Sequence, residues 1–310
     1  MSNPPLPGPP DVSPDHEPVQ PQAYSPPGLP GYPMLGVPDS DPRFDPADPL
    51  VSADFAGWWR RGFAVIRRGW RALALVQVLT AAATLVVLIP AELFDDLSSR
   101  DFSDPDGLSG PLLAANGLMV VANCLEPLIY LIGTLVTVRV TVSIATGADP
   151  GVGRAVRAVL PRVPAMIGWS LLTSLITVAA LLAFVLPVFY VAAVFVVLPV
   201  VVLFEPGNPV TRCFSLFHND LGAAVARIAT IAGLGLAISL PLIVGTAALS
   251  LTGVTAFTDT SSIVLGSVTG TVLGELGPLI CGVVLIPLTV AAYADLRARR
   301  EPFTTAWLDA

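Results

Sequence analysis

Residues 163–204 read VPAMIGWSLLTSLITVAALLAFVLPVFYVAAVFVVLPVVVLF, a run of 42 residues without a charged side chain. A helix needs about 20 apolar residues to cross a hydrocarbon core of about 30 Å, because each residue rises about 1.5 Å. The run is therefore long enough for two spans. Pro187, in the segment FVLPVFY, is expected to start the second span, because proline breaks a helix interior but fits its first turn.

Four further apolar runs extend this pattern to six spans: residues 72–90, 111–147, 221–249 and 262–294. In lipid, a helix satisfies its own backbone hydrogen bonds, so we predict an all-α integral membrane protein with six transmembrane helices. The composition agrees with this prediction. Charged residues make up 13% of the chain and the mean hydropathy is +0.74, whereas about a quarter of the residues of a soluble domain are charged.

Arginine marks one side of the predicted membrane domain. All 16 basic residues are arginine, and most lie before the first span, between spans two and three, between spans four and five, or after the sixth. The loop after the first span, AELFDDLSSRDFSDPDGLSG, instead holds six acidic residues and one arginine. Since arginine-rich loops stay in the cytoplasm, we predict a multi-pass plasma-membrane protein with cytoplasmic N- and C-termini.

The stretch WWRRGFAVIRRGWR, residues 58–71, forms the first arginine-rich segment. Counted from three residues before this stretch, five apolar residues recur at helical spacing and share one face: Phe55, Trp59, Phe63, Ile66 and Trp70. This pattern predicts an interfacial amphipathic helix over 55–71, with arginines near lipid phosphates and tryptophans at headgroup depth. The residues expected to anchor it are Trp58, Trp59, Arg60, Arg61, Arg67, Arg68, Trp70 and Arg71. A patch that binds nucleic acid or a partner protein is the alternative.

An arginine-bearing segment followed by two spans occurs three times. GVGRAVRAVLPR precedes the third span and NPVTRCFSLFHNDLGAAVAR precedes the fifth. We therefore predict three units, each an interfacial helix and a membrane hairpin, in residues 55–147, 151–205 and 208–296. The second helix of each hairpin is expected to begin at a proline, namely Pro127, Pro187 and Pro278.

The two ends of the chain differ from the membrane domain, which we place at residues 72–296. Residues 1–50 contain 16 of the 31 prolines, seven acidic residues and one arginine. Such a segment buries too little apolar surface to fold, so we predict a disordered cytoplasmic tail. Its proline spacings either present polyproline II ligands to a protein partner or arise by chance. Residues 297–310 are expected to form a cytoplasmic C-terminal tail.

Ionisable residues inside apolar runs are the first candidates for function, because a charge is unfavourable in the membrane interior. Glu126, Glu275 and Arg139 are of this kind. If the second helices of the hairpins begin at the prolines after the glutamates, both carboxylates lie at the outer headgroup boundary, which is the arrangement we expect. If these helices begin near residues 112 and 262, the carboxylates lie deeper and form an ion or proton site.

A second group of charges lies at the ends of the spans: Glu205, Arg212, Asp295 and Arg297. Glu205 and Arg212 form either an interfacial ion pair or two separately hydrated charges. Asp295 and Arg297 are expected to form one charge cluster at the end of the sixth span. Three side-chain amides are candidates for hydrogen bonds between helices, worth about 0.6 to 2 kcal/mol each: Gln77, Asn116 and Asn123.

No catalytic, cofactor or metal motif stands out. The only histidines are His16 and His218, and the three cysteines are scattered. We expect no enzyme activity, no cofactor and no nucleic-acid partner. Two function classes remain, namely a protein that organises membrane lipids or partner proteins, and a transporter whose pathway is lined by Glu126 and Glu275.

Three segments carry a family resemblance: ATGADPGVGRAVRAVLPRVPAMIG, VLPVVVLFEPGNPVTRCFSLF and AAYADLRARREPF. They resemble the membrane domain associated with bacterial glycerophosphoryl diester phosphodiesterases, over roughly residues 55–309. The resemblance implies a six-helix fold in the plasma membrane. It does not imply phosphodiesterase activity, which belongs to a separate barrel with histidine and carboxylate metal ligands. Cys213 stands where relatives often carry serine, which puts any role of that hydroxyl in doubt.

Overall fold

The computed structural model describes residues 44–98, 110–251 and 260–309, and within these residues the regular structure is entirely helical. Six helices are long and apolar enough to cross a membrane. The prediction of an all-α protein with six membrane-spanning helices is therefore confirmed.

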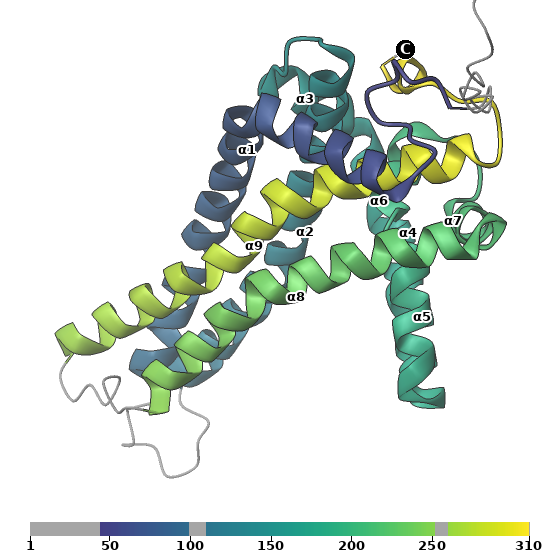
Figure 1. Ribbon diagram of the computed structural model, residues 1–310. Helices are drawn as coiled ribbons and strands as arrows, with labels where there is room; N and C mark the ends of the chain where they lie inside the picture. Colours follow the sequence, from purple (N-terminus) through teal and green to yellow (C-terminus); the bar gives the residue numbers. More distant parts are fainter. Residues whose placement is uncertain (1–43, 99–109, 252–259, 310) are drawn as a thin grey trace, which may run out of the picture. The chain divides into compact units, whose positions relative to one another are not determined.

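The order of the helices follows the three predicted units (Figure 1). In chain order they are α1 Phe55–Ser98, α2 Gly110–Thr146, α3 Val152–Val159, α4 Val163–Ala183, α5 Val185–Phe195, α6 Leu198–Phe204, α7 Pro209–Asn219, α8 Leu221–Leu251 and α9 Thr260–Ala298. Short 3-10 turns cover Leu160–Arg162 and Thr305–Leu308. Helices α5 and α6 together make the fourth span, and a short helical segment precedes each pair of spans.

The first short segment is the start of α1, which bends at Gly69. The backbone of Gly69 has φ −115° and ψ 16°, outside the helical region. A Cβ atom at this position would lie 2.1 Å from Cδ1 of Ile144, so glycine lets the bend rest directly on α2. The predicted end of the first short helix, residue 71, is thus two residues away from the observed bend.

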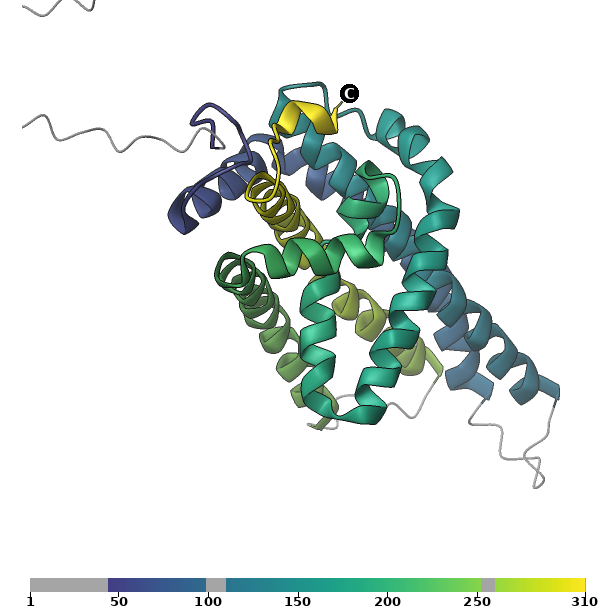
Figure 2. The same cartoon turned by 90° about the vertical axis from the view of Figure 1, so that its right-hand side faces the viewer.

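The long apolar run of residues 163–204 breaks where α4 ends. Phe184 is fully extended, with φ −176° and ψ 159°, and α5 begins at the next residue. Pro187 lies in the first turn of α5 and not at its first position. Figure 2 shows α4 and α5 as an antiparallel hairpin. The prediction of a break in this run is therefore correct, but the second helix begins at Val185 and not at Pro187.

Two predicted helix starts are wrong. Helices α2 and α9 begin at Gly110 and Thr260 and continue through Pro127 and Pro278. Proline is tolerated inside a membrane helix because neighbouring helices and side-chain hydroxyls satisfy the backbone groups that it frees. Glu126 and Glu275 consequently lie in the middle of long helices.

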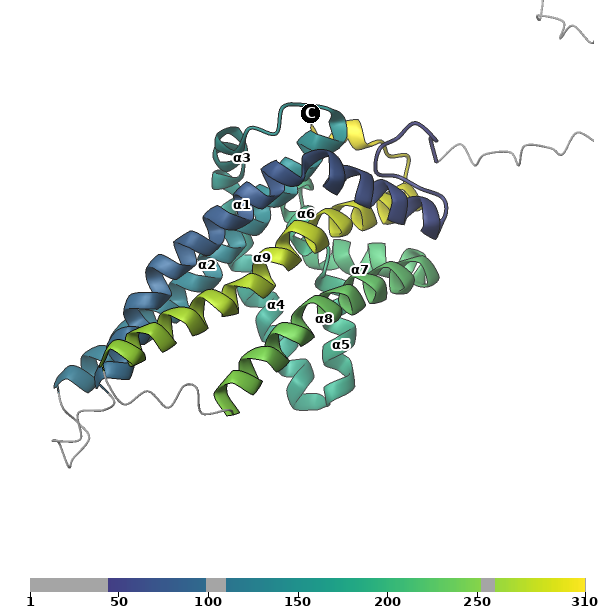
Figure 3. The ribbon, with the colours of Figure 1, turned by 60° about the vertical axis from the view of Figure 1, so that its left-hand side comes forward.

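Helices α1, α2 and α9 pack side by side and form the core (Figure 3). Leu73, Leu135 and Leu288, one from each helix, have no exposed surface. In the most apolar part of α9, 61% of the residues are buried, against 11% in the span that contains α4 and 11% in α8. The third and fifth spans therefore present most of their apolar side chains outward.

Polar contacts join the core helices. Gln77 of α1 donates a hydrogen bond of 2.7 Å to the Thr137 hydroxyl of α2, as predicted for an interhelical amide. Gly282 of α9 makes room for it, since a Cβ atom there would lie 2.2 Å from the Gln77 amide oxygen. Asn123 instead bonds the carbonyl of Met119 in its own helix, so its predicted interhelical bond is absent among the described residues.

The segment before α1 packs against the segment after α9. Asp48 accepts hydrogen bonds from the Thr305 backbone N–H (2.7 Å) and hydroxyl (2.5 Å), and Leu50 is completely buried. The predicted disordered tail covers residues 1–50. Residues 1–43 lie outside the described residues, whereas residues 44–50 are part of the folded protein.

Candidate functional site

The charges predicted at the ends of the spans form an ion-pair network, which we call the paired network. Arg212 of α7 lies 2.5 Å from Glu205 and 2.6 Å from Glu301. Arg297 of α9 lies 2.6 Å from the same Glu301 oxygen. Of the two alternatives for Glu205 and Arg212, the ion pair is therefore the one observed.

Tyr293 of α9 also belongs to the paired network. Its hydroxyl donates to Glu205 (2.5 Å) and accepts from Arg297 (2.9 Å), and the side chain is fully buried. Burial acts to raise the pKa of Glu301, but hydrogen bonds from Arg297 and Arg212 outweigh it and hold the pKa below its usual value. The network thus ties α7, α9 and the segment after α9 together through charged groups.

Asp295 belongs to a separate, more deeply buried pair. It has no exposed surface, and its carboxylate lies 2.7 Å from Arg227 of α8 and 3.1 Å from Arg299. The predicted cluster of Asp295 with Arg297 is therefore wrong. Residues two positions apart on a helix do not face each other, so the two side chains point to different neighbours.

Trp58 is not a membrane anchor. Its side chain has no exposed surface, and the Arg227 guanidinium lies 5.9 Å from the ring centroid. A completely buried ring contacts protein and cannot reach lipid headgroups. Trp70, by contrast, is 54% exposed, as an anchoring residue must be.

Arg139 is also placed differently from the prediction of an isolated charge in a span. Its guanidinium lies 3.0 Å from the Asp309 carboxylate and donates a hydrogen bond of 2.7 Å to the Leu308 carbonyl. It therefore holds the C-terminal segment against α2. Three partners were not predicted from the sequence: Arg227, Glu301 and Asp309. The pairs Arg227–Asp295, Arg212–Glu301 and Arg139–Asp309 join residues far apart in the chain, whereas the spacing of four between Arg297 and Glu301 is a local signal that could have been used.

A second set of arginines, on α1 and α3, forms no ion pair, although the Arg60 charge acts on the nearby Asp54 carboxylate; we call this set the unpaired arginine surface. Its members are exposed and form no ion pair with any residue that the structure describes: Arg60, Arg67 and Arg71 of α1 and Arg157 of α3. Their neighbours Arg61 and Arg68 donate to backbone carbonyls, of Asp48 and Ile144. Four exposed arginines outside any ion pair thus lie on the two short helical segments and, for Arg71, two residues past the bend at Gly69.

The two glutamates of α2 and α9 are brought close to a common cavity. Tyr130 donates a hydrogen bond of 2.5 Å to Glu275, which is 7% exposed. Tyr130 and Glu126 line a cavity of about 620 Å³ between α2, α4 and α6, together with Ser170 of α4. Within the described residues, neither glutamate forms an ion pair with a basic side chain.

The described residues contain no group of three or more histidine, cysteine, aspartate or glutamate side chains that could hold a metal ion. Cys213 is buried, and burial raises the pKa of its thiol to about 12, so it stays protonated and unreactive at neutral pH.

Comparison with known proteins gives no match. No protein-family model, no curated protein and no solved structure is similar to this chain at a significant level. The assignment of a function therefore depends on the geometry of the chain itself.

Proposed function

We propose that the protein is a non-enzymatic, multi-pass plasma-membrane protein that binds and organises anionic lipids on its cytoplasmic side. The unpaired arginine surface supports this proposal most directly. An exposed arginine that forms no ion pair at a membrane surface is attracted to lipid phosphates by about 1 kcal/mol. Four such residues, Arg60, Arg67, Arg71 and Arg157, lie on helical segments that also carry exposed apolar side chains such as Trp70.

Lipid retention tests the proposal. Arg60, Arg67, Arg71 and Arg157 are each replaced by glutamine, and the matched control replaces the same four residues by lysine. Phospholipids that stay with the detergent-purified protein are then counted by mass spectrometry. We expect the glutamine variant to lose anionic lipid and the lysine variant to keep it, since the charge is retained. Equal retention by the glutamine variant and the unchanged protein would refute the proposal.

The proposal includes cytoplasmic termini, which the positive-inside rule supports. Alkaline phosphatase fused after residue 105 should be active outside the cytoplasm, whereas the same enzyme fused to the C-terminus should be inactive. Activity of the C-terminal fusion, alone or together with the other, or activity of neither fusion, would contradict this orientation. We also propose that the proline-rich tail binds a protein partner. We further propose that the chain belongs with the membrane domains associated with phosphodiesterases. The fusion experiment tests neither of these two points.

A permeation pathway is the second candidate, and one observation favours it. Glu126 lines a cavity among the spans, beside the Tyr130–Glu275 hydrogen bond, with no basic partner in the described residues. Carboxylates in such a place are typical of ion and proton pathways. Single cysteines at 126 and 275, in a chain without the native three, should then react with a water-soluble reagent at a rate that a substrate changes. No reaction from either side would exclude the pathway.

A further inference from the structure

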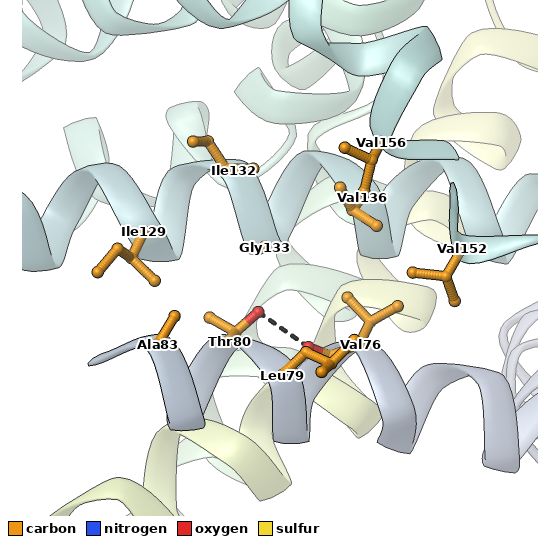
Figure 4. A pocket seen from close by; sticks show the side chains of 10 residues that line it. All are labelled: Val76, Leu79, Thr80, Ala83, Ile129, Ile132, Gly133, Val136, Val152 and Val156. Atoms are coloured by element: carbon orange, nitrogen blue, oxygen red, sulfur yellow. Dashed lines mark hydrogen bonds between the residues drawn. The ribbon is translucent and has the colours of Figure 1, made fainter. Parts of the chain in front are cut away.

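A groove runs between α1 and α2 on the surface that α3 borders (Figure 4). Its volume is about 260 Å³. Val76 and Val136 form part of its buried floor, and Leu79 forms part of its rim with 52% of its surface exposed. Val152 and Val156 of α3 lie at one end, so the groove is closed there by the apolar face of a short helix.

The polar side chain at the floor of the groove is already hydrogen-bonded within the protein, so the floor is apolar toward an occupant. Thr80 is the polar side chain of the lining, and its hydroxyl donates to the Val76 carbonyl of its own helix at 2.9 Å. Gly133 lies opposite, where a Cβ atom would come within 2.4 Å of the Thr80 hydroxyl. The two helices therefore meet closely at the floor and leave an apolar slot above it, which suits a hydrocarbon chain.

Positive charge lies beside the end of the groove that α3 closes. Arg157 follows the lining residue Val156 directly and has no ion pair with any described residue. On α1, Arg71 lies one turn before Leu75, on the helix face of Leu75 and Ala82, which lies outside the groove lining. Arg154 differs from both arginines, since Asp149 neutralises it. An apolar slot that ends beside an uncompensated cation, Arg157, matches the two parts of an anionic phospholipid.

We propose that this groove binds one acyl chain of an anionic phospholipid, whose phosphate lies against Arg157. The inference deepens the proposed function, on which it rests, by assigning a specific site and a ligand class to it. The charge at the end of the groove favours an anionic lipid over a second copy of this chain, whose facing surface would carry the same arginines.

The test fills the groove. Ala83 is exposed and lines the groove, whereas its neighbour Ala82 is also exposed and lies outside the lining. The variants Ala83→Phe and Ala82→Phe therefore form a matched pair. Each is placed in nanodiscs of equal parts phosphatidylglycerol and phosphatidylcholine, and the lipids that remain bound after extraction are counted by native mass spectrometry.

We expect the unchanged protein and Ala82→Phe to retain one phosphatidylglycerol that Ala83→Phe loses. Arg157→Gln should keep a lipid but lose the preference for phosphatidylglycerol. Leu79→Trp, with Leu75→Trp as its control, repeats the test should Ala83→Phe fail to fold. Leu79 lines the groove, and the two leucines are 52% and 50% exposed.

Three results would overturn the inference. Equal retention by Ala83→Phe and Ala82→Phe rejects the site, and equal retention of both lipids by the unchanged protein rejects the charge preference. A dimer that Ala83→Phe alone converts to monomer, with no change in bound lipid, identifies a second copy as the occupant. If the glutamine variant at four positions loses lipid but Ala83→Phe does not, the proposed function stands and only this site fails.

Discussion

The paired network and the unpaired arginine surface use the same side chain in two different ways. In the paired network, Arg212 lies between Glu205 and Glu301 at 2.5 and 2.6 Å, and its charge joins elements of the protein to one another. On the unpaired arginine surface, Arg67 and Arg157 are exposed, and no described acidic residue pairs with them.

The difference follows from where the acidic residues lie. Asp220, Asp295 and Glu301 stand at or near the ends of α8 and α9, so arginines from these elements meet carboxylates as the helices pack. The start of α1 and helix α3 have few acidic residues in or next to them. An arginine with a partner inside the protein stabilises the fold, whereas one without a partner is available for lipid phosphate.

The largest effect is expected at the most buried pair. Arg227→Met leaves the Asp295 carboxylate, which has no exposed surface, with Arg299 as its remaining cation. Breaking a buried pair is expected to lower the free energy of unfolding by about 3 kcal/mol. Arg154→Gln is the control, because both side chains of its pair with Asp149 are more than half exposed, and its effect should stay below about 1 kcal/mol. Equal shifts of the melting temperature in detergent would contradict this ranking.

A smaller effect is expected where the two ends of the described chain meet. Asp48→Ala removes the acceptor for both Thr305 bonds and for the backbone N–H groups of Leu50 and Val51. The loss should be about 2 kcal/mol, and residues after α9 should become more sensitive to protease. Asp45→Ala serves as control, since Asp45 accepts one exposed bond, from Ala47. Equal protease sensitivity of the two variants would show that Asp48 does not hold the segment.

The smallest effect is a pH dependence of the paired network. The pKa of Glu301 is lower in the folded protein than its usual value of 4.5, because its hydrogen bonds with Arg297 and Arg212 outweigh burial. The stability it contributes is therefore present above 4.5 and is lost as the pH falls through the lowered folded value. Glu301→Gln should flatten the fall of the melting temperature in this acidic range. If the melting temperature of Glu301→Gln falls as steeply as that of the unchanged protein, other carboxylates cause the pH dependence.

Local patterns sufficed for the spans and for one ion pair. Apolar length predicted the six helices, and Glu205 and Arg212 are close enough in sequence to be suspected as partners. Partners far apart in sequence, such as Arg227 and Asp295, left no such signal, because packing alone brings them together. The starts of α2 and α9 were missed for a different reason. A proline such as Pro127 or Pro278 breaks a helix in a soluble protein, whereas packed membrane helices accommodate it.

Trp58 shows the same limit on a smaller scale. It stands next to Trp59 in a segment that is amphipathic as a whole, and composition assigned both to the lipid interface. Trp58, one residue before Trp59, faces the protein, and the Arg227 guanidinium lies over its ring. Which tryptophans meet lipid depends on the rotation of the helix, and that rotation is set by packing against the rest of the protein.

The most direct test of the two roles of arginine is the melting temperature of the protein in nanodiscs of phosphatidylglycerol compared with nanodiscs of phosphatidylcholine. A lipid that binds the folded state raises the melting temperature. We predict a higher value in phosphatidylglycerol for the unchanged protein, and no difference between the two lipids once Arg60, Arg67, Arg71 and Arg157 are all glutamine. A glutamine variant that kept the full difference would contradict the assignment of these arginines to lipid.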